Sequence, residues 1–290
     1  MLILVMVVFL VFLVLGMPIA FCMALSAGAA IVLNPSLPAT IVAQKIYTAV
    51  DSISFIAIPL FMMAGSLMNS TGITDKIIEF FENLVGHITG GLAHAGVLTG
   101  MLMAGVSGSS VADAAAISTI MVPQLEKNGY DRGFAGALIS SAGSLGPIIP
   151  PSIIMIVYSG VVSISVGKLF MAGLLPGIML GVMMIIYCYI YAKKRGLGRG
   201  TFAGWNAVGK SFLRSFGALV MPLIIIGGIV LGICTATESG ILAIIYGICY
   251  GFISKQLNIK KLWKSIEESV AGAAQPMIII SFASLLAYVL

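Results

Sequence analysis

Two stretches rich in glycine, serine and proline interrupt an otherwise apolar chain, at residues 104–115 and 140–152. Neither stretch is suited to an ordinary membrane helix. At bilayer depth, irregular backbone is tolerated only where it is buried in protein or lines a water-filled cavity. Secondary transporters build their substrate and ion sites from such interrupted helices near the middle of the membrane. The two stretches therefore predict a transport site.

The second stretch contains Pro147, Pro150 and Pro151, and each proline lacks the backbone N–H that a helix would use. By this rule the three prolines would free the carbonyls of Gly143, Gly146 and Pro147. Freed carbonyls together with serine hydroxyls are suitable ligands for a cation such as Na⁺. We predict a Na⁺ site shared by both stretches, with the ligands Ser107, Gly108, Ser109, Ser110, Ser141, Gly143, Ser144 and Gly146.

The helix that resumes after the prolines would point its positive N-terminal end back at the break. A substrate carboxylate could be held there. The residues predicted to face it are Pro147, Pro150, Pro151 and Ser152. Asp113, in an alanine run, would either ligate the cation or cap the adjacent turn by accepting backbone N–H bonds, and we favour the structural role. A plainer alternative is that these glycines and prolines only kink helices for packing.

Composition indicates a membrane protein. Apolar residues make up 60% of the chain and charged residues 9%, which excludes an ordinary soluble domain. The formal net charge of +5 does not indicate nucleic-acid binding, because the basic residues cluster in loops between apolar runs. The four cysteines lie apart without metal-binding spacing, and we interpret them as packing residues. The run from Leu2 is too long, and lacks the basic start, for a cleavable signal peptide.

Apolar periodicity predicts an all-α, multi-pass fold. Two short apolar helices, at residues 92–106 and 111–122, form a predicted re-entrant hairpin with a polar tip at 107–110. Residues 133–143 and 152–162 are predicted to be one broken helix. The other expected elements are an apolar stretch at 2–33 kinked at Pro18, a span at 46–68 capped by Asp51 and Ser52, amphipathic helices at 75–87 and 259–271, spans at 169–192, 219–234 and 241–253, and an apolar run at 277–290.

Basic loops predict the orientation in the membrane. The loop at residues 193–214 holds six lysines and arginines and no acidic residue, and more lysines follow at 255–264. Both loops are expected on the cytoplasmic side. The turn at 235–238, for which Thr237 is the predicted cap, then lies on the opposite side. The same order of elements occurs twice, from residue 1 and again from near residue 217: two spans, an amphipathic helix and an apolar helix. This order predicts an internal repeat.

The segment from Gly105 to Gly108 also matches the G-x-S-G pattern of intramembrane serine proteases, with Ser107 as nucleophile. Those enzymes need a histidine on a later helix as base. His87 and His94 both precede the serine, so this reading is disfavoured. A non-transporting membrane scaffold is a further alternative, but it would not need oxygen-lined breaks.

The sequence resembles the large membrane subunit of TRAP (tripartite ATP-independent periplasmic) transporters. The resemblance rests on residues 57–61, 86–94, 105–116 and 146–152, which include Val111-Ala112-Asp113-Ala114-Ala115-Ala116 and Gly146-Pro147-Ile148-Ile149-Pro150-Pro151-Ser152. One departure is Ala236, where the family usually has a proline. The resemblance implies a non-enzymatic importer of small organic anions, with Na⁺ as coupling ion and no other cofactor. A stand-alone divalent-anion/sodium symporter is the runner-up.

The resemblance further implies an all-α polytopic membrane protein of the bacterial inner membrane, with an inverted repeat and an elevator-type mechanism. Its partners would be a small membrane (Q) subunit, a periplasmic substrate-binding protein, a small organic anion and the lipid bilayer, and no nucleic acid. The expected domains are scaffold helices at 1–72, an amphipathic arm at 73–91, a transport-domain hairpin and broken helix at 92–163, a span and basic loop at 164–216, and the start of a second repeat at 217–290, expected to be incomplete.

Overall fold

The computed structural model describes residues 1–34, 38–107, 110–197 and 204–290. Every regular element in these residues is an α-helix. In chain order the thirteen helices are α1 (Leu2–Val14), α2 (Ile19–Leu33), α3 (Thr40–Val50), α4 (Ile53–Ser70), α5 (Ile73–Val85), α6 (Gly91–Ser107), α7 (Ser110–Lys127), α8 (Arg132–Gly143), α9 (Ile153–Val162), α10 (Val166–Arg195), α11 (Trp205–Val230), α12 (Ala236–Ile253) and α13 (Ile259–Val289).

Four of these helices are long and apolar enough to cross a membrane: α10, α11 from Val208 onward, α12 and α13. The bent pair of α3 and α4, which meet at 59°, would add a fifth if counted as one span. The prediction of an all-α, multi-pass membrane protein is therefore confirmed.

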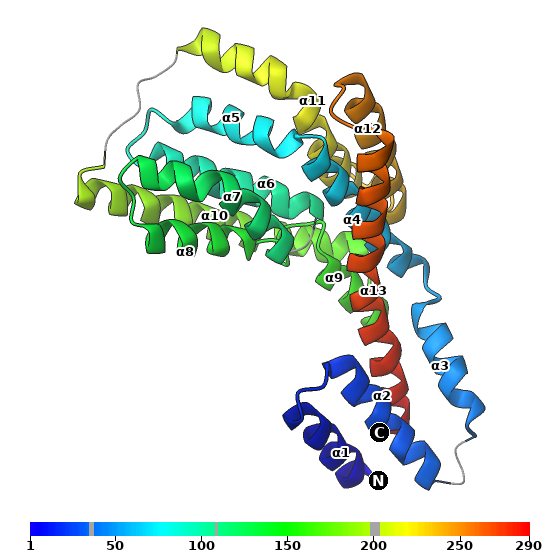
Figure 1. The fold of residues 1–290 in the computed structure, drawn as a ribbon. Coiled ribbons are helices and arrows are strands. Elements are labelled where there is room, and N and C mark those ends of the chain that lie inside the picture. The colour runs from blue at the N-terminus through cyan, green and yellow to red at the C-terminus, as the bar shows by residue number, and fades with distance from the viewer. Residues whose placement is uncertain (35–37, 108–109, 198–203) are drawn as a thin grey trace.

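The helices form two groups that meet near α4. Helices α5, α6, α7, α8 and α10 lie side by side in one body, while α4, α12 and α13 run across its end (Figure 1). Helices α2 and α3 pack against the C-terminal part of α13, and α1 packs against α2 (Figure 1). One large apolar cluster joins the two groups through buried side chains such as Phe61, Ile77, Met103 and Phe170. Inside a membrane such a cluster is held together mainly by van der Waals packing.

The first apolar stretch is two helices rather than one kinked span. After α1, Gly16 adopts a left-handed φ of +79°, which glycine reaches without a steric penalty. The Met17 N–H then donates to the carbonyl of Phe12 at 3.1 Å, in the manner of a Schellman cap. Pro18 precedes α2, so the chain reverses and α2 packs against α1. The prediction of a single stretch kinked at Pro18 is wrong because Gly16 ends the helix first.

Two other boundaries differ from prediction. Asp51 and Ser52 separate α3 from α4, so the second span is a bent pair, and Ser52 occupies the N-cap position without a side-chain cap bond. In contrast, α13 continues unbroken through Pro276 and joins the predicted amphipathic helix to the apolar run. Proline removes only one N–H, and neighbouring helices can compensate for it in a membrane protein.

The amphipathic helix predicted at residues 75–87 is confirmed as α5. Its buried side includes Ile77 and Ile78. Polar contacts attach it to α11, which lies beside it, and to α12: the Lys76 ammonium donates to the Tyr250 hydroxyl of α12 at 2.6 Å, and the Ser215 hydroxyl of α11 donates to the Lys76 carbonyl at 2.8 Å. The arm is therefore fixed to α11 and α12 at its N-terminal end.

The turn between α11 and α12 is capped by Thr235 rather than Thr237. The Thr235 hydroxyl accepts from the Glu238 N–H at 3.3 Å, and the Glu238 carboxylate accepts from the Thr235 N–H at 2.8 Å. This reciprocal pair is a capping box, which requires the cap three residues before the acid. Ala236 then occupies the first helical position, where proline would also be compatible with a helix.

Candidate ion and substrate site

The first predicted stretch forms a helical hairpin. Helix α6 ends at Ser107, α7 begins at Ser110, and the two helices pack against each other (Figure 1). Gly108 and Ser109 lie outside the described residues, and of Ser107 only the helical backbone is described. The ligand roles of these three residues therefore stay predictions. Ser110 is half-buried at the start of α7.

Helix α8 packs closely against both arms of this hairpin. A Cβ atom added to Gly100 of α6 would lie 2.6 Å from the Cβ of Ala142. One added to Gly143 would lie 2.7 Å from the Cβ of Ala114 in α7 and 2.9 Å from the carbonyl oxygen of Ser110. Such close backbone approach is the usual role of small residues between membrane helices. Two predicted ligand residues, Ser110 and Gly143, thus lie against each other.

The backbone tightens where α8 ends. The Gly146 N–H donates to the Gly143 carbonyl at 3.1 Å, and the Ile148 N–H donates to the Leu145 carbonyl at 2.9 Å. These bonds join residues three apart, as in a 3₁₀ turn. The prediction that Pro147 frees the Gly143 carbonyl is wrong, because the tighter turn gives this carbonyl a donor one residue before the proline.

The carbonyl of Pro147 is also occupied, contrary to prediction. The Ser152 hydroxyl donates to it at 2.9 Å and accepts from the Met155 N–H at 3.3 Å. Ser152 is fully buried and caps α9, so its hydroxyl is engaged within the protein. The Gly146 carbonyl differs: among the described residues no donor reaches it, as Pro150 predicts.

Two serines before the break lie in different surroundings. Ser144 is exposed, and its hydroxyl donates to the Ser141 carbonyl at 2.7 Å. A hydroxyl that donates in this way keeps lone pairs with which to ligate a cation. The Ser141 side chain lines a groove between α8 and α10. Ser144 is therefore the more suitable partner for the Gly146 carbonyl.

The prolines lead directly into a new helix. Pro147 is half-buried, Pro150 and Pro151 are buried, and the peptide bond between the last two is cis. Helix α9 begins at Ile153, so its first N–H groups follow the prolines at once. The positive end of the helix dipole therefore starts at the break. The broken helix is confirmed, whereas the assignment of individual residues to the substrate stays a prediction.

Helix α10 closes one side of the break. A Cβ atom added to Gly173 would lie 2.6 Å from the carbonyl oxygen of Ile148, and one added to Gly177 would lie 2.5 Å from Cγ1 of Ile149. A Cβ on Gly181 would meet the side chain of Met101 in α6. Larger residues at these positions would push α10 away from the break.

Asp113 and Thr99 are two of the buried polar residues on the hairpin arms. Asp113 is fully buried in the first turn of α7, next to the residue that contacts Gly143. Sequence analysis missed Thr99, which is fully buried on α6 beside Gly100 and whose hydroxyl has no hydrogen-bond partner in the described part of the chain. A buried polar atom without a partner calls for an explanation. An isolated threonine in an apolar helix was the available signal.

Two ionisable groups outside the membrane spans are perturbed. Burial raises the pKa of the Glu82 carboxyl on α5 above its ordinary value of 4.5, and the charge of Glu79 adds to this effect. Burial likewise raises the pKa of Tyr130, between α7 and α8, to about 12, with smaller contributions from Cys188 and Tyr191. Neither group lies at the break.

A separate cavity of about 390 Å³ lies where α4, α10 and the turn between α11 and α12 meet. Ser54, Ser165, Thr235 and Thr237 are among its lining residues. It contains none of the predicted site residues and lies at the boundary between the two helix groups.

The fold and the break define a class: a multi-pass membrane protein with a helical hairpin packed on a broken helix, as in secondary transporters. Residues 6–290 match the family described as the tripartite ATP-independent periplasmic transporter, DctM component. The chain belongs to this family. It is a multi-pass protein of the bacterial inner membrane.

Individual relatives support this assignment. The chain is 36% identical over 282 residues to the isethionate TRAP transporter permease protein DctMQ of Oleidesulfovibrio alaskensis, covering 96% of the chain and 44% of that protein. It is 38% identical over 279 residues to a putative TRAP transporter large permease protein of Haemophilus influenzae, covering 96% and 65%. It is 37% identical over 268 residues to the 2,3-diketo-L-gulonate TRAP transporter large permease protein YiaN of Escherichia coli, covering 92% and 62%. The chain thus spans about half to two thirds of these relatives.

Proposed function

We propose that this chain serves in the large permease of a TRAP transporter that imports a small organic acid with Na⁺ as the coupling ion. Family membership supports the permease role, and the relatives named above are called permeases for isethionate and 2,3-diketo-L-gulonate. Both names denote small organic acids or their anions. The proposed transported substrate is therefore a small organic anion. The protein would act as a carrier rather than an enzyme.

The cation site is proposed at the junction of the hairpin and the broken helix. Its ligands are the Gly146 carbonyl, the Ser144 hydroxyl and oxygens of the hairpin tip from Ser107 to Ser110. The observation that carries this proposal is the buried Gly146 carbonyl without a donor in the described residues, two positions from an exposed serine. The contact between Gly143 and Ser110 brings the first turn of α7 to the same place. Oxygens of interrupted helices are typical Na⁺ ligands in transporters.

The substrate carboxylate is proposed to lie at the N-terminal end of α9, beyond Pro150 and Pro151. Free N–H groups and the helix dipole favour an anion at such an end. Na⁺ would order the hairpin tip against the broken helix and so prepare the anion site. A second ligand that binds an already ordered site bears less of the ordering cost, which gives coupling between the two.

The mechanism is proposed to be of the elevator type. The body formed by α6 to α10 would move as the transport domain relative to α4, α11, α12 and α13, with α5 as the connecting arm. The chain order from residue 217 onward would begin an inverted second repeat. A periplasmic substrate-binding protein would deliver the anion, and a small Q subunit would complete the membrane assembly.

Uptake by the purified full-length complex in proteoliposomes tests this function. The isethionate and 2,3-diketo-L-gulonate anions are suitable first cargoes, each with and without an inward Na⁺ gradient and with and without the periplasmic protein. Uptake that needs both the gradient and the periplasmic protein supports the proposal. Uptake driven by Na⁺ without the periplasmic protein would assign a stand-alone symporter instead. Uptake at the same rate with and without the Na⁺ gradient would contradict the proposed cation site.

A further inference from the structure

An apolar groove runs between α8 and α10 on the outside of the helix body. It has a volume of about 330 Å³ and is lined by Ala137, Leu138 and Ser141 from α8 and by Leu180, Met183 and Met184 from α10. Met183 is 58% exposed, so the groove opens to the surface at this side chain. The eight residues from Leu180 to Tyr187 extend over about 10 Å of helix. This covers most of the depth of one hydrocarbon leaflet, about 15 Å.

One end of the groove is closed by stacked aromatic rings. The ring centroids of Phe134 and Tyr187 are 6.2 Å apart, and Phe134 stacks on Tyr191 at 3.6 Å. The guanidinium of Arg195 lies 5.5 Å from the centre of the Tyr191 ring. Aromatic contacts therefore connect the apolar groove, through Tyr187, Phe134 and Tyr191, to the guanidinium of Arg195. Tyrosine is the residue type expected at the membrane interface.

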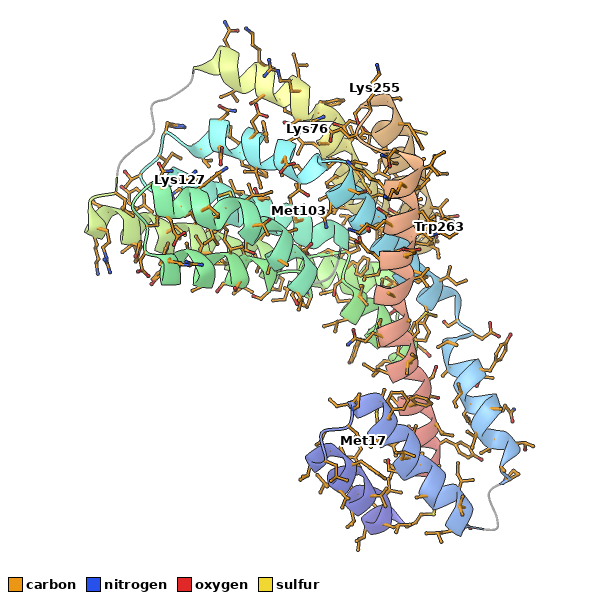
Figure 2. The ribbon with its side chains drawn as sticks, in the orientation of Figure 1. Met17, Lys76, Met103, Lys127, Lys255 and Trp263 are labelled. Atoms are coloured by element: carbon orange, nitrogen blue, oxygen red, sulfur yellow. The ribbon has the colours of Figure 1, made fainter. Side chains whose placement is uncertain are left out.

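Positive charge accumulates at this aromatic end. Helices α8 and α10 run antiparallel, since Phe134 near the start of α8 contacts Tyr191 near the end of α10. This brings residues 126–132 beside residues 193–195, and a Cβ on Gly129 would lie 3.4 Å from Leu197 (Figure 1). The two segments carry five cationic side chains, namely Lys127, Arg132, Lys193, Lys194 and Arg195, and Figure 2 shows Lys127 at this end of the body.

Two acidic residues share the same end but do not neutralise it. Glu126 pairs with Arg132 at 3.6 Å, and the Asp131 carboxylate accepts from the Phe134 N–H at 3.0 Å. Three cationic charges remain in excess over these two segments. The loop that follows Arg195 is the basic loop expected on the cytoplasmic side, where the leaflet carries anionic lipids.

We propose that this groove binds one anionic phospholipid of the cytoplasmic leaflet. An acyl chain lies between α8 and α10 along Leu180 and Met183, and the phosphate lies among Arg132, Lys193, Lys194 and Arg195. Charge complementarity favours this occupant, because basic pockets between membrane helices on the cytoplasmic side bind anionic headgroups. The inference does not depend on Na⁺ coupling or on the identity of the transported anion.

Native mass spectrometry of the full-length protein, with equal amounts of phosphatidylglycerol and phosphatidylcholine in the detergent, tests this site. We expect selective retention of phosphatidylglycerol. Replacing both Lys193 and Lys194 by glutamine should weaken retention by about fivefold per charge, while Lys260→Gln should have no effect. Ala137→Trp should fill the groove and abolish retention. Leu175→Trp, at a residue of α10 that is 67% exposed and outside the groove, is the matched control.

Three results would overturn the proposal. Equal retention of the two lipids would show that the site does not select an anionic headgroup. Unchanged retention in the double lysine variant would show that these two charges do not bind the lipid. Loss of thermal stability in Ala137→Trp that is the same with and without lipid would mean that protein, rather than lipid, fills the groove. If that variant does not fold, the double lysine variant decides the matter, since both of its positions are exposed.

Discussion

Replacement of Gly143 by alanine tests the contact between the hairpin and the broken helix. The added Cβ would lie 2.7 Å from the Cβ of Ala114 and 2.9 Å from the Ser110 carbonyl oxygen. Carbon atoms in ordinary contact are ~3.5–4.0 Å apart, so α7 and α8 would have to separate by about 1 Å. Overpacking of this kind costs about 1–3 kcal/mol, and alanine in a helix returns about 0.5–1 kcal/mol relative to glycine.

The expected net loss is about 1–2 kcal/mol, or roughly a factor of 5 to 30 in an equilibrium constant. It should appear in two measurements on the full-length complex: a lower thermal unfolding midpoint and a higher Na⁺ concentration for half-maximal uptake. Gly136→Ala on the same helix is the matched control, because a Cβ there would meet nothing within 4 Å. Equal behaviour of the two variants would refute the reasoning about this contact.

Three further predictions concern positions outside the break, each measured as thermal unfolding of the full-length protein. Tyr250→Phe removes the acceptor of the 2.6 Å bond from Lys76 and should destabilise the attachment of α5 by about 1.5–3 kcal/mol. The Glu82 pKa is raised by burial and by Glu79, so stability should be full below pH 4.5 and fall as the pH rises through the raised value, and Glu82→Gln should remove this loss. Thr235→Ala removes the capping box of α12 and should cost about 1 kcal/mol.

Each of these variants has a matched control in the chain. Tyr158→Phe removes a hydroxyl from an exposed tyrosine on α9, and Glu267→Gln removes an exposed carboxylate from α13. Thr237→Ala changes the threonine that does not cap α12. A variant that behaves like its control contradicts the contact assigned to it. For Glu82, an unchanged pH profile in the glutamine variant would exclude this carboxyl as the titrating group.

The broken elements were predictable from sequence because their signals are local. Gly143 and the three prolines mark the end of one helix and the start of the next, and in the structure α8 ends at Gly143 and α9 begins at Ile153. The capping role of Ser152 was not predicted. Long apolar runs likewise predicted the spans. The hydrogen-bond partner of each carbonyl at the break was less predictable. Pro147 removes one donor, but the sequence does not tell whether a tighter turn or a side chain replaces that donor.

Boundaries that depend on competing local signals were harder to predict. Pro18 suggested a kink, whereas the left-handed Gly16 had already ended α1. Pro276 suggested a break, whereas α13 continues through it. The sequence predicted that the two stretches meet, but not which residues touch: the close approach of Gly143 to Ala114 depends on how α7 and α8 pack.

The junction of hairpin and broken helix is proposed to bind Na⁺ through neutral oxygens. Equilibrium binding of radioactive Na⁺ to the purified full-length protein tests it most directly, with Ser144→Ala compared against Ser140→Ala, an exposed serine one turn earlier on α8. We expect saturable Na⁺ binding that Ser144→Ala weakens by about tenfold, because the loss of one ligand costs about 1.4 kcal/mol. Ser140→Ala should leave the binding unchanged. Equal Na⁺ binding by both variants and the unmodified protein would contradict the proposed site.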